Sequence, residues 1–164
     1  MGPGAEAWAA SLARFKPLNL GIGGDQTQHV LWRIRHGELD GLQPRMLVLL
    51  IGTNNLGSGI WDPAATARGI ETVLQEIRTR LPATHILHLA IFPRGEFADD
   101  PMRAKVAETN QLLAGLAIPQ RTFVDMGSIF LDADGRISRA LMDDFLHPTA
   151  AGYSRWAQRL ESEF

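Results

Sequence analysis

Short runs rich in apolar and β-branched residues alternate with amphipathic stretches along the chain. Three such runs, at residues 46–51, 85–92 and 121–125, each end at or close to a glycine or proline, which predicts three strands. Residues 18–20 form a shorter extended segment and a fourth strand candidate. Because the run at 46–51 contains no polar residue, we expect that strand to be buried on both faces.

Helical periodicity fills the stretches between these runs. Asp62 followed by Pro63 is typical of a helix start, with an N-cap residue and then proline at the first helical position. Apolar residues then recur at helical spacing, at Ile70, Val73, Leu74, Ile77 and Leu81. Similar patterns predict helices over residues 26–35, 101–116 and 149–160.

The order of these segments predicts an α/β fold in a single domain that spans residues 1–164. Alternating strands and helices imply parallel strands joined by right-handed crossovers, with helices on both faces of the sheet. In open sheets of this kind, ligands bind beyond the carboxyl ends of the strands. Residues that directly follow the predicted strands are therefore the first candidates for a functional site.

Composition and charge exclude several classes of function. The formal net charge is −2 and the sequence pI is about 6.2, so the chain has no strong basic field to attract nucleic acid. It contains no cysteine, which excludes disulfides, thiolate catalysis and cysteine-ligated zinc. No apolar run is long enough to span a bilayer. The sequence therefore predicts a soluble protein and leaves its compartment open, with the cytoplasm favoured over secretion.

Two loops after predicted strands contain groups that can bind a developing negative charge. Residues 21–25 include a glycine pair whose tight turn would leave the Gly24 N–H pointing outward, and Asn54 follows the run 46–51 with a side-chain amide. Both features also have simpler interpretations, because glycines punctuate most turns and asparagine often caps them. A dinucleotide-binding fingerprint is disfavoured, since Gln26 stands where its third glycine is required.

A third cluster pairs a carboxylate with an imidazole ahead of the last predicted helix. Asp144 precedes His147 by three residues, so one loop could bring the carboxylate onto the ring nitrogen that faces away from a substrate. Such a contact fixes the histidine tautomer and stabilises the imidazolium that forms when the histidine accepts a proton. Taken alone, this spacing is more often found in an ordinary surface loop.

The three clusters together resemble sequence blocks of the SGNH (GDSL-type) hydrolase superfamily, in the same order and at similar spacing. Four further segments, at residues 19–25, 28–33, 37–39 and 93–96, resemble one branch of that superfamily in particular. This branch contains esterases like the catalytic subunits of intracellular platelet-activating-factor acetylhydrolase. The resemblance covers the chain from about residue 8 onward.

The resemblance implies a three-layer αβα sandwich with a parallel, flavodoxin-like sheet. It implies a serine esterase that acts on short-chain esters, acetyl esters above all, without a cofactor or a metal. In that reading the Gly24 N–H and the Asn54 amide form the oxyanion hole, His147 is the general base and Asp144 orients it. The implied partner is a small lipid or carbohydrate acetyl ester, and a homodimer is left open.

One block of the family pattern is missing from these residues. The family's nucleophile is a serine in a Gly-Asp-Ser motif at the end of the first strand, and the 164 residues contain no such motif. We therefore expect an N-terminally truncated domain without that first strand. Ser58 is the serine nearest to a motif loop, but a flexible Gly57-Ser58-Gly59 turn is the favoured interpretation. The rival functions are a non-catalytic relative that keeps the crevice as a binding or interaction surface, and a flavodoxin-like nucleotide-binding module.

Two patterns that suggest metal sites have simpler explanations. His85 and His88 occupy odd and even positions of one strand, so their side chains point to opposite faces and cannot chelate one ion. Residues 132–135 resemble the start of a calcium loop, but Asp143 stands at the twelfth position where such a loop requires glutamate. We expect ordinary sheet residues and a turn at these places.

Overall fold

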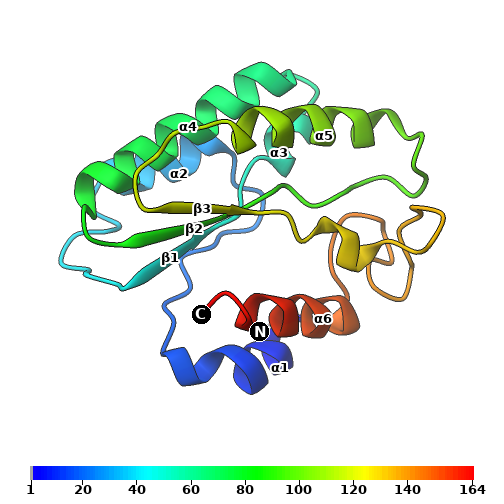
Figure 1. The fold of residues 1–164 in the computed structure, drawn as a ribbon, viewed down its shortest axis with the longest axis horizontal. Coiled ribbons are helices and arrows are strands. Elements are labelled where there is room, and N and C mark those ends of the chain that lie inside the picture. Colours follow the sequence, from blue (N-terminus) through cyan, green and yellow to red (C-terminus); the bar gives the residue numbers. More distant parts are fainter. Residues whose placement is uncertain (1) are drawn as a thin grey trace. The chain divides into compact units, whose positions relative to one another are not determined.

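Three parallel strands form the sheet of the computed structural model (Figure 1). β1 (Met46–Leu49), β2 (His85–Leu89) and β3 (Arg121–Val124) lie side by side in that order. The register of β1 on β2 places Met46 opposite His85. The parallel arrangement and the interleaved helices confirm the α/β class predicted from the alternation of segments.

The structure describes residues 2–164, and the chain divides into two compact units. The sheet unit consists of Ile22–Phe92 and Ala104–Asp125. The terminal unit consists of Met1–Gly21, Pro93–Arg103 and Met126–Phe164. Of the candidate site residues, Gly24 and Asn54 fall in the sheet unit, and Asp144 and His147 fall in the terminal unit.

Helices of the sheet unit lie along one face of its sheet (Figure 1). They are α2 (Thr27–Arg35), α3 (Thr53–Gly57), α4 (Pro63–Arg80) and the part of α5 (Pro101–Ala114) that belongs to this unit. α2 packs against α4. The helices predicted for the second face of the sheet stay a prediction, because the remaining helices belong to the terminal unit.

The longest helix, α4, begins and packs as its sequence predicts. The Asp62 carboxylate accepts a hydrogen bond from the Ala65 N–H at 2.6 Å, and Pro63 occupies the first turn, where no N–H is needed. Its apolar stripe forms the centre of the core, with Ile70, Val73, Leu74 and Ile77 each at most 1% exposed. The burial of these apolar side chains therefore holds α4 in place in the core, and the loop that precedes Pro63 is attached to this fixed helix.

The terminal unit is built from the two ends of the chain. α1 (Ala5–Ala7) continues into a π-helical turn, Trp8–Leu12, and both pack against α6 (Ala150–Glu161). The rings of Phe15 and Phe164 stack with their centroids 4.5 Å apart. The helix predicted over residues 149–160 is therefore confirmed as α6, and the helical segments before it in this unit are short and irregular.

Two strand predictions are wrong. Residues 18–20 form no strand of the sheet, and Leu18 is 64% exposed. β1 is not buried on both faces, since Val48 is 37% exposed. Among the described residues β1 is paired with β2 alone and is an edge strand, and a run of apolar residues does not reveal how many neighbours its strand will have.

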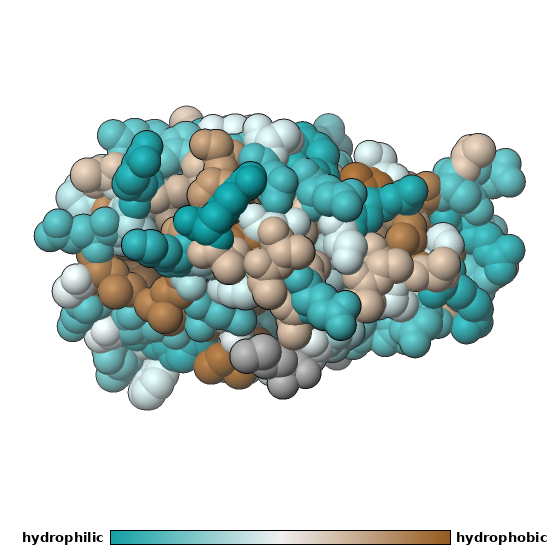
Figure 2. Space-filling view, turned by 90° about the horizontal axis from the view of Figure 1, so that it is seen from below, coloured by the Kyte–Doolittle hydropathy of each residue, from teal (hydrophilic) through white to brown (hydrophobic). Residues whose placement is uncertain are grey.

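Exposed apolar side chains are scattered over the surface. The large ones include Leu18, Ile22, Trp32 and Phe97, which are all more than half exposed. The face drawn in Figure 2 shows hydrophobic residues as separate patches among hydrophilic ones. No helix among residues 2–164 is long and apolar enough to cross a membrane.

Candidate active site

Asp144 and His147 form a short, well-oriented hydrogen-bonded pair in the terminal unit. Asp144 Oδ2 lies 2.6 Å from His147 Nδ1. Asp144 Oδ1 accepts hydrogen bonds from the backbone N–H groups of Leu146, at 3.0 Å, and His147, at 2.7 Å. A carboxylate can only accept here, so Nδ1 of the histidine carries the proton and Nε2 is left with its lone pair available. This is the arrangement required of a histidine that acts as a general base.

The same contacts set the charge of Asp144. The side-chain hydrogen bond from His147 is the largest cause, followed by the hydrogen bond from the His147 backbone, and together they lower the pKa of Asp144 from 3.8 to about 2. Both side chains are accessible to solvent, with relative exposures of 51% for Asp144 and 75% for His147. Asp144 is therefore ionised throughout the neutral range, and the histidine nitrogen that could receive a proton is open to a ligand.

A strained residue shapes the loop between these two side chains. Phe145 has a φ of +60°, in the left-handed region that residues with a Cβ seldom occupy. Its carbonyl accepts a hydrogen bond from the Gly95 N–H at 3.1 Å, and the guanidinium of Arg139 lies 4.4 Å from the centre of its ring. Such strain costs about 1–3 kcal/mol and persists where surrounding contacts hold it. The sequence contains no signal for it, since phenylalanine is not a residue that marks left-handed positions.

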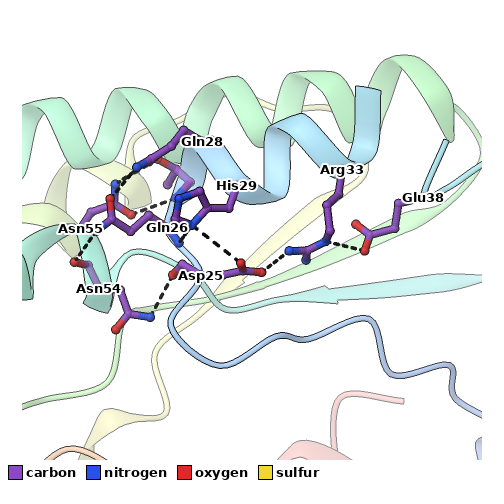
Figure 3. A network of polar contacts seen from close by, with 9 residues as sticks. Asp25, Gln26, Gln28, His29, Arg33, Glu38, Asn54 and Asn55 are labelled. Carbon is purple, nitrogen blue, oxygen red and sulfur yellow. Dashed lines mark hydrogen bonds and ion pairs between the residues drawn. The ribbon is translucent and has the colours of Figure 1, made fainter. Parts of the chain in front are cut away.

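In the sheet unit, several hydrogen bonds join the two segments that carry the other candidates. The side-chain amide of Asn54 donates to the backbone carbonyl of Asp25 at 2.9 Å (Figure 3). Gly24, directly before Asp25, has a φ of +83° and open space where a Cβ would project. The two predicted oxyanion donors, Gly24 and Asn54, are thus placed on neighbouring loops.

Each of these two residues retains an N–H that can bind a ligand. The Asn54 amide nitrogen carries two hydrogens, and its one hydrogen bond, to Asp25, leaves the second available. The Gly24 N–H has no partner among residues 2–164, and it lies in an exposed turn closed by a hydrogen bond from the Asp25 N–H to the Ile22 carbonyl at 3.3 Å. Two unused N–H donors on adjacent loops can stabilise an oxyanion.

Hydrogen bonds of the buried Asn55 side chain join α3 to the start of α2. It is 2% exposed, its Oδ1 accepts from the Thr27 N–H at 3.0 Å, and its Nδ2 donates to the Thr27 hydroxyl at 3.1 Å. Gln26 adds a longer hydrogen bond of 3.4 Å to the carbonyl of Asn54. The sequence alone does not distinguish the roles of the adjacent residues Asn54 and Asn55. Their burial does, because Asn55 is buried and hydrogen-bonded to Thr27, whereas Asn54 is only partly buried.

The four candidate residues therefore form two pairs, one in each unit. The structure brings Asp144 to His147 and the Gly24 loop to Asn54. The assembly of the two pairs around one substrate stays a prediction. Sequence reasoning also missed the ionic contacts of Asp25, which pairs with Arg33 and lies near His29, while Arg33 also pairs with Glu38 (Figure 3).

The remaining candidates occupy ordinary structural positions. The Ser58 hydroxyl donates to the carbonyl of Asn55 at 2.7 Å and accepts from the Ile60 N–H at 3.2 Å, as expected for a turn. Asp132 Oδ1 accepts two backbone N–H bonds within its own loop, from Asp134 and Arg136. Within residues 2–164 no group of three or more His, Cys, Asp or Glu side chains is placed to hold a metal ion.

His85 and His88 differ in their surroundings. His85 is partly exposed, and its Nε2 lies 3.0 Å from the Thr122 hydroxyl. His88 is fully buried, and its Nδ1 accepts from Arg121 Nε at 3.0 Å. Burial, with a smaller effect of the Arg121 charge, lowers the pKa of His88 from 6.5 to about 3. His88 is therefore a neutral core residue.

Comparison with solved structures places this fold among known hydrolases. A protein from Streptococcus pneumonia named for platelet activating factor superposes with a TM-score of 0.77 and 28% identity, over 89% of this chain and 71% of that one. A variant of an acetyl-xylooligosaccharide esterase from Geobacillus Stearmophilus gives a TM-score of 0.76 over 98% of this chain and 78% of the other. At 18% identity, the second similarity concerns the fold alone.

Comparison of sequences is more specific. The chain is 41% identical over 153 residues to the platelet-activating factor acetylhydrolase IB subunit alpha2 of Rattus norvegicus, which covers 92% of this chain. The matched region is 65% of that relative's length, so the chain spans a little under two thirds of it. Residues 2–155 match the profile of the GDSL-like Lipase/Acylhydrolase family. The chain therefore belongs to the GDSL-like lipase and acylhydrolase family.

Proposed function

We propose that the chain supplies the oxyanion hole and the acid–histidine pair of a serine esterase that hydrolyses short-chain esters, acetyl esters above all. The observation that carries the proposal is the 2.6 Å contact between Asp144 and His147, in which two backbone N–H groups also hold the carboxylate. Membership of the acylhydrolase family supports the reaction class, and the names of the relative and of the esterase with the same fold support an acetyl group.

The proposed mechanism uses His147 for proton transfer in both halves of the reaction, acylation and deacylation. Its Nε2 takes the proton of a serine hydroxyl as that oxygen attacks the ester carbonyl, and Asp144 stabilises the imidazolium that results. The imidazolium then protonates the departing alkoxide, which leaves an acyl-serine. A water molecule, deprotonated by the same nitrogen, attacks the acyl-serine, and the imidazolium returns that proton to the departing serine oxygen, which releases the acid and the free serine.

In both steps the carbonyl oxygen becomes an oxyanion. The proposal assigns its stabilisation to the Gly24 N–H and the second hydrogen of the Asn54 amide. Support comes from the hydrogen bond between Asn54 and the Asp25 carbonyl, which fixes the amide before a substrate binds. Donors that are oriented in advance do not need to reorganise during the reaction, which is why each can contribute a factor of about 10²–10³ in rate.

The nucleophile in this proposal is the serine of the family's Gly-Asp-Ser block, a motif that the 164 residues do not contain. Ser58 is a poor substitute, because its hydroxyl is already used as a donor to Asn55 and as an acceptor from Ile60. A non-catalytic module that binds a small molecule in the same crevice is the second candidate function, and the experiment below separates the two.

The test compares two polypeptides in the hydrolysis of p-nitrophenyl acetate. One is the 164-residue chain, and the other is the same chain joined to a first strand that carries Gly-Asp-Ser. We expect activity in the extended polypeptide alone, abolished by Ser→Ala in the added motif and unaffected by Ser58→Ala. If the extended polypeptide is folded and inactive, the esterase proposal is wrong and the binding module is favoured. If Ser58→Ala removes the activity, the assignment of the nucleophile is wrong.

A further inference from the structure

The glycine turn that carries the candidate oxyanion donor is held to the protein by one buried residue. Ile22 is 58% exposed, and Gly23 and Gly24 are exposed as well. Asp25 is the residue of this turn that is buried. An exposed turn rich in glycine has many conformations of similar energy, so its geometry depends on what anchors Asp25.

The anchor is a partly buried cluster of charges that links Asp25 to the last turn of α2. Arg33 Nη1 forms a short hydrogen bond and ion pair with Asp25 Oδ2, and Arg33 Nε donates to Glu38 Oε1 at 2.6 Å (Figure 3). The side chains of Asp25, Arg33 and Glu38 are only 12–17% exposed. A guanidinium that forms hydrogen bonds with two carboxylates holds both of them in a fixed geometry.

The main chain of Asp25 transmits this geometry to the candidate site. Its carbonyl accepts the hydrogen bond from Asn54 at 2.9 Å, and the peptide before it belongs to Gly24. Nδ1 of His29 accepts from the Gln26 N–H at 3.1 Å and lies 3.8 Å from the Asp25 carboxylate, so the residue after Asp25 is also tied to α2. A movement of the Asp25 carboxylate would therefore displace both donors together.

We infer that Asp25 and Arg33 are positioning residues, whose buried ion pair fixes the Asp25 carbonyl and thereby orients the Asn54 amide and the Gly24 N–H. The inference deepens the proposed esterase function and rests on it for its catalytic consequence. Neither side chain is assigned a contact with substrate. The pair acts through the backbone between the two loops, as a support for groups that bind the oxyanion.

The test separates geometry from catalysis by measuring each in its own experiment. In the 164-residue chain, NMR spectroscopy follows the side-chain amide signals of Asn54 and the backbone amide signal of Gly24. Asp25→Asn removes the charge at constant size, and Arg33→Lys keeps the charge but loses the planar fork. We expect both variants to shift these signals and to accelerate hydrogen exchange of the Asn54 amide.

Arg35→Met is the matched control, because Arg35 lies on the same helix and forms an exposed ion pair with Glu76 at 3.1 Å. It should leave the signals of Asn54 and Gly24 unchanged. If Asp25→Asn and Arg33→Lys are folded and also leave them unchanged, the inference is wrong. Arg33→Met serves as a third variant, and should it fail to fold, Asp25→Asn and Arg33→Lys still decide the outcome.

The catalytic consequence is measured in the polypeptide that carries the Gly-Asp-Ser strand. A misplaced donor affects the transition state more than the bound substrate, so we expect Asp25→Asn to lower kcat about 10–100-fold and to change KM by less than about twofold. Arg33→Lys should show a smaller loss. A rise in KM alone, with kcat unchanged, would mean that the pair does not position the oxyanion donors.

Failure of the inference and failure of the proposed function give different results. If Asn54→Ala has no effect on kcat while Asp25→Asn still disturbs the Asn54 signals, the positioning role stands and the oxyanion assignment falls. If Asn54→Ala lowers kcat and Asp25→Asn changes neither the signals nor kcat, the oxyanion assignment stands and the positioning role falls.

Discussion

Gly52 occupies a position that no other residue can fill without strain. It lies just before α3 and Asn54, and its φ of +119° is far from the values that residues with a Cβ adopt. A Cβ at this position would come within 2.8 Å of the terminal methyl carbons of both Ile70 and Ile91. Gly52→Ala therefore combines backbone strain with overpacking of the core beneath the candidate site.

The expected loss follows from these two contributions. A residue forced into a sparsely populated conformation costs about 1–3 kcal/mol, and extra volume in a packed core costs about the same. The sum, about 2–6 kcal/mol, is a large part of the 5–15 kcal/mol that typically stabilises a protein of this size. Because α3 begins at the next residue, the strain should also reach Asn54 and lower the proposed activity of the polypeptide that carries the Gly-Asp-Ser strand.

Gly59→Ala is the matched control. Gly59 also has a positive φ, of +73°, but a Cβ there would meet nothing within 4 Å. Both substitutions restrict the unfolded chain equally, so this effect cancels in the comparison. Urea denaturation should give a free energy of unfolding about 1–3 kcal/mol lower for Gly52→Ala than for Gly59→Ala. If the two values agree within about 0.5 kcal/mol, the packing around Gly52 is not as described.

Three further predictions concern charge and capping. Because the pKa of His88 is low in the folded protein, His88 stays neutral there at pH values below about 6.5, at which the unfolded chain binds a proton. The free energy of unfolding should therefore fall with decreasing pH, by up to about 1.4 kcal/mol per pH unit. His88→Leu should flatten that dependence in urea titrations, and an unchanged slope would contradict it. The Asp144 carboxyl should titrate near pH 2 by ¹³C NMR, so its interaction with His147 is lost only as the pH falls through that value, and His147→Ala should return the midpoint toward 3.8. The Thr149 hydroxyl caps α6 by accepting a hydrogen bond from the Gly152 N–H. Thr149→Ala should therefore lower the stability by about 1 kcal/mol, as measured by thermal unfolding.

The sequence was most informative where one physical signal dominated. The cap at Asp62 and the apolar stripe from Ile70 to Ile77 predicted α4, and the structure confirms both. The prediction of α4 required only local spacing. The clusters at Asn54 and Asp144 have ordinary structural interpretations when taken alone, and they became candidates because three clusters together resemble the blocks of one family in the same order.

Features that depend on tertiary contacts were not predictable. The edge position of β1 depends on which strands pair. The left-handed conformation of Phe145 is accompanied by contacts with Gly95, which is distant in the sequence, and with Arg139, which is not a residue typical of turns. The ion pair between Asp25 and Arg33 joins a loop to a helix, so no periodicity within a single element reveals it. Its burial became visible only in three dimensions.

The central claim is that His147, oriented by Asp144, is the general base of an ester hydrolase. The most direct test is the rate of p-nitrophenyl acetate hydrolysis by the polypeptide that carries the Gly-Asp-Ser strand, measured for the unmodified His147 and for His147→Ala. Nucleophile and base act as one unit, so the account predicts a fall in kcat of several orders of magnitude, about 10⁴-fold or more, in a variant that remains folded. A folded His147→Ala variant with kcat close to that of the unmodified protein would contradict it.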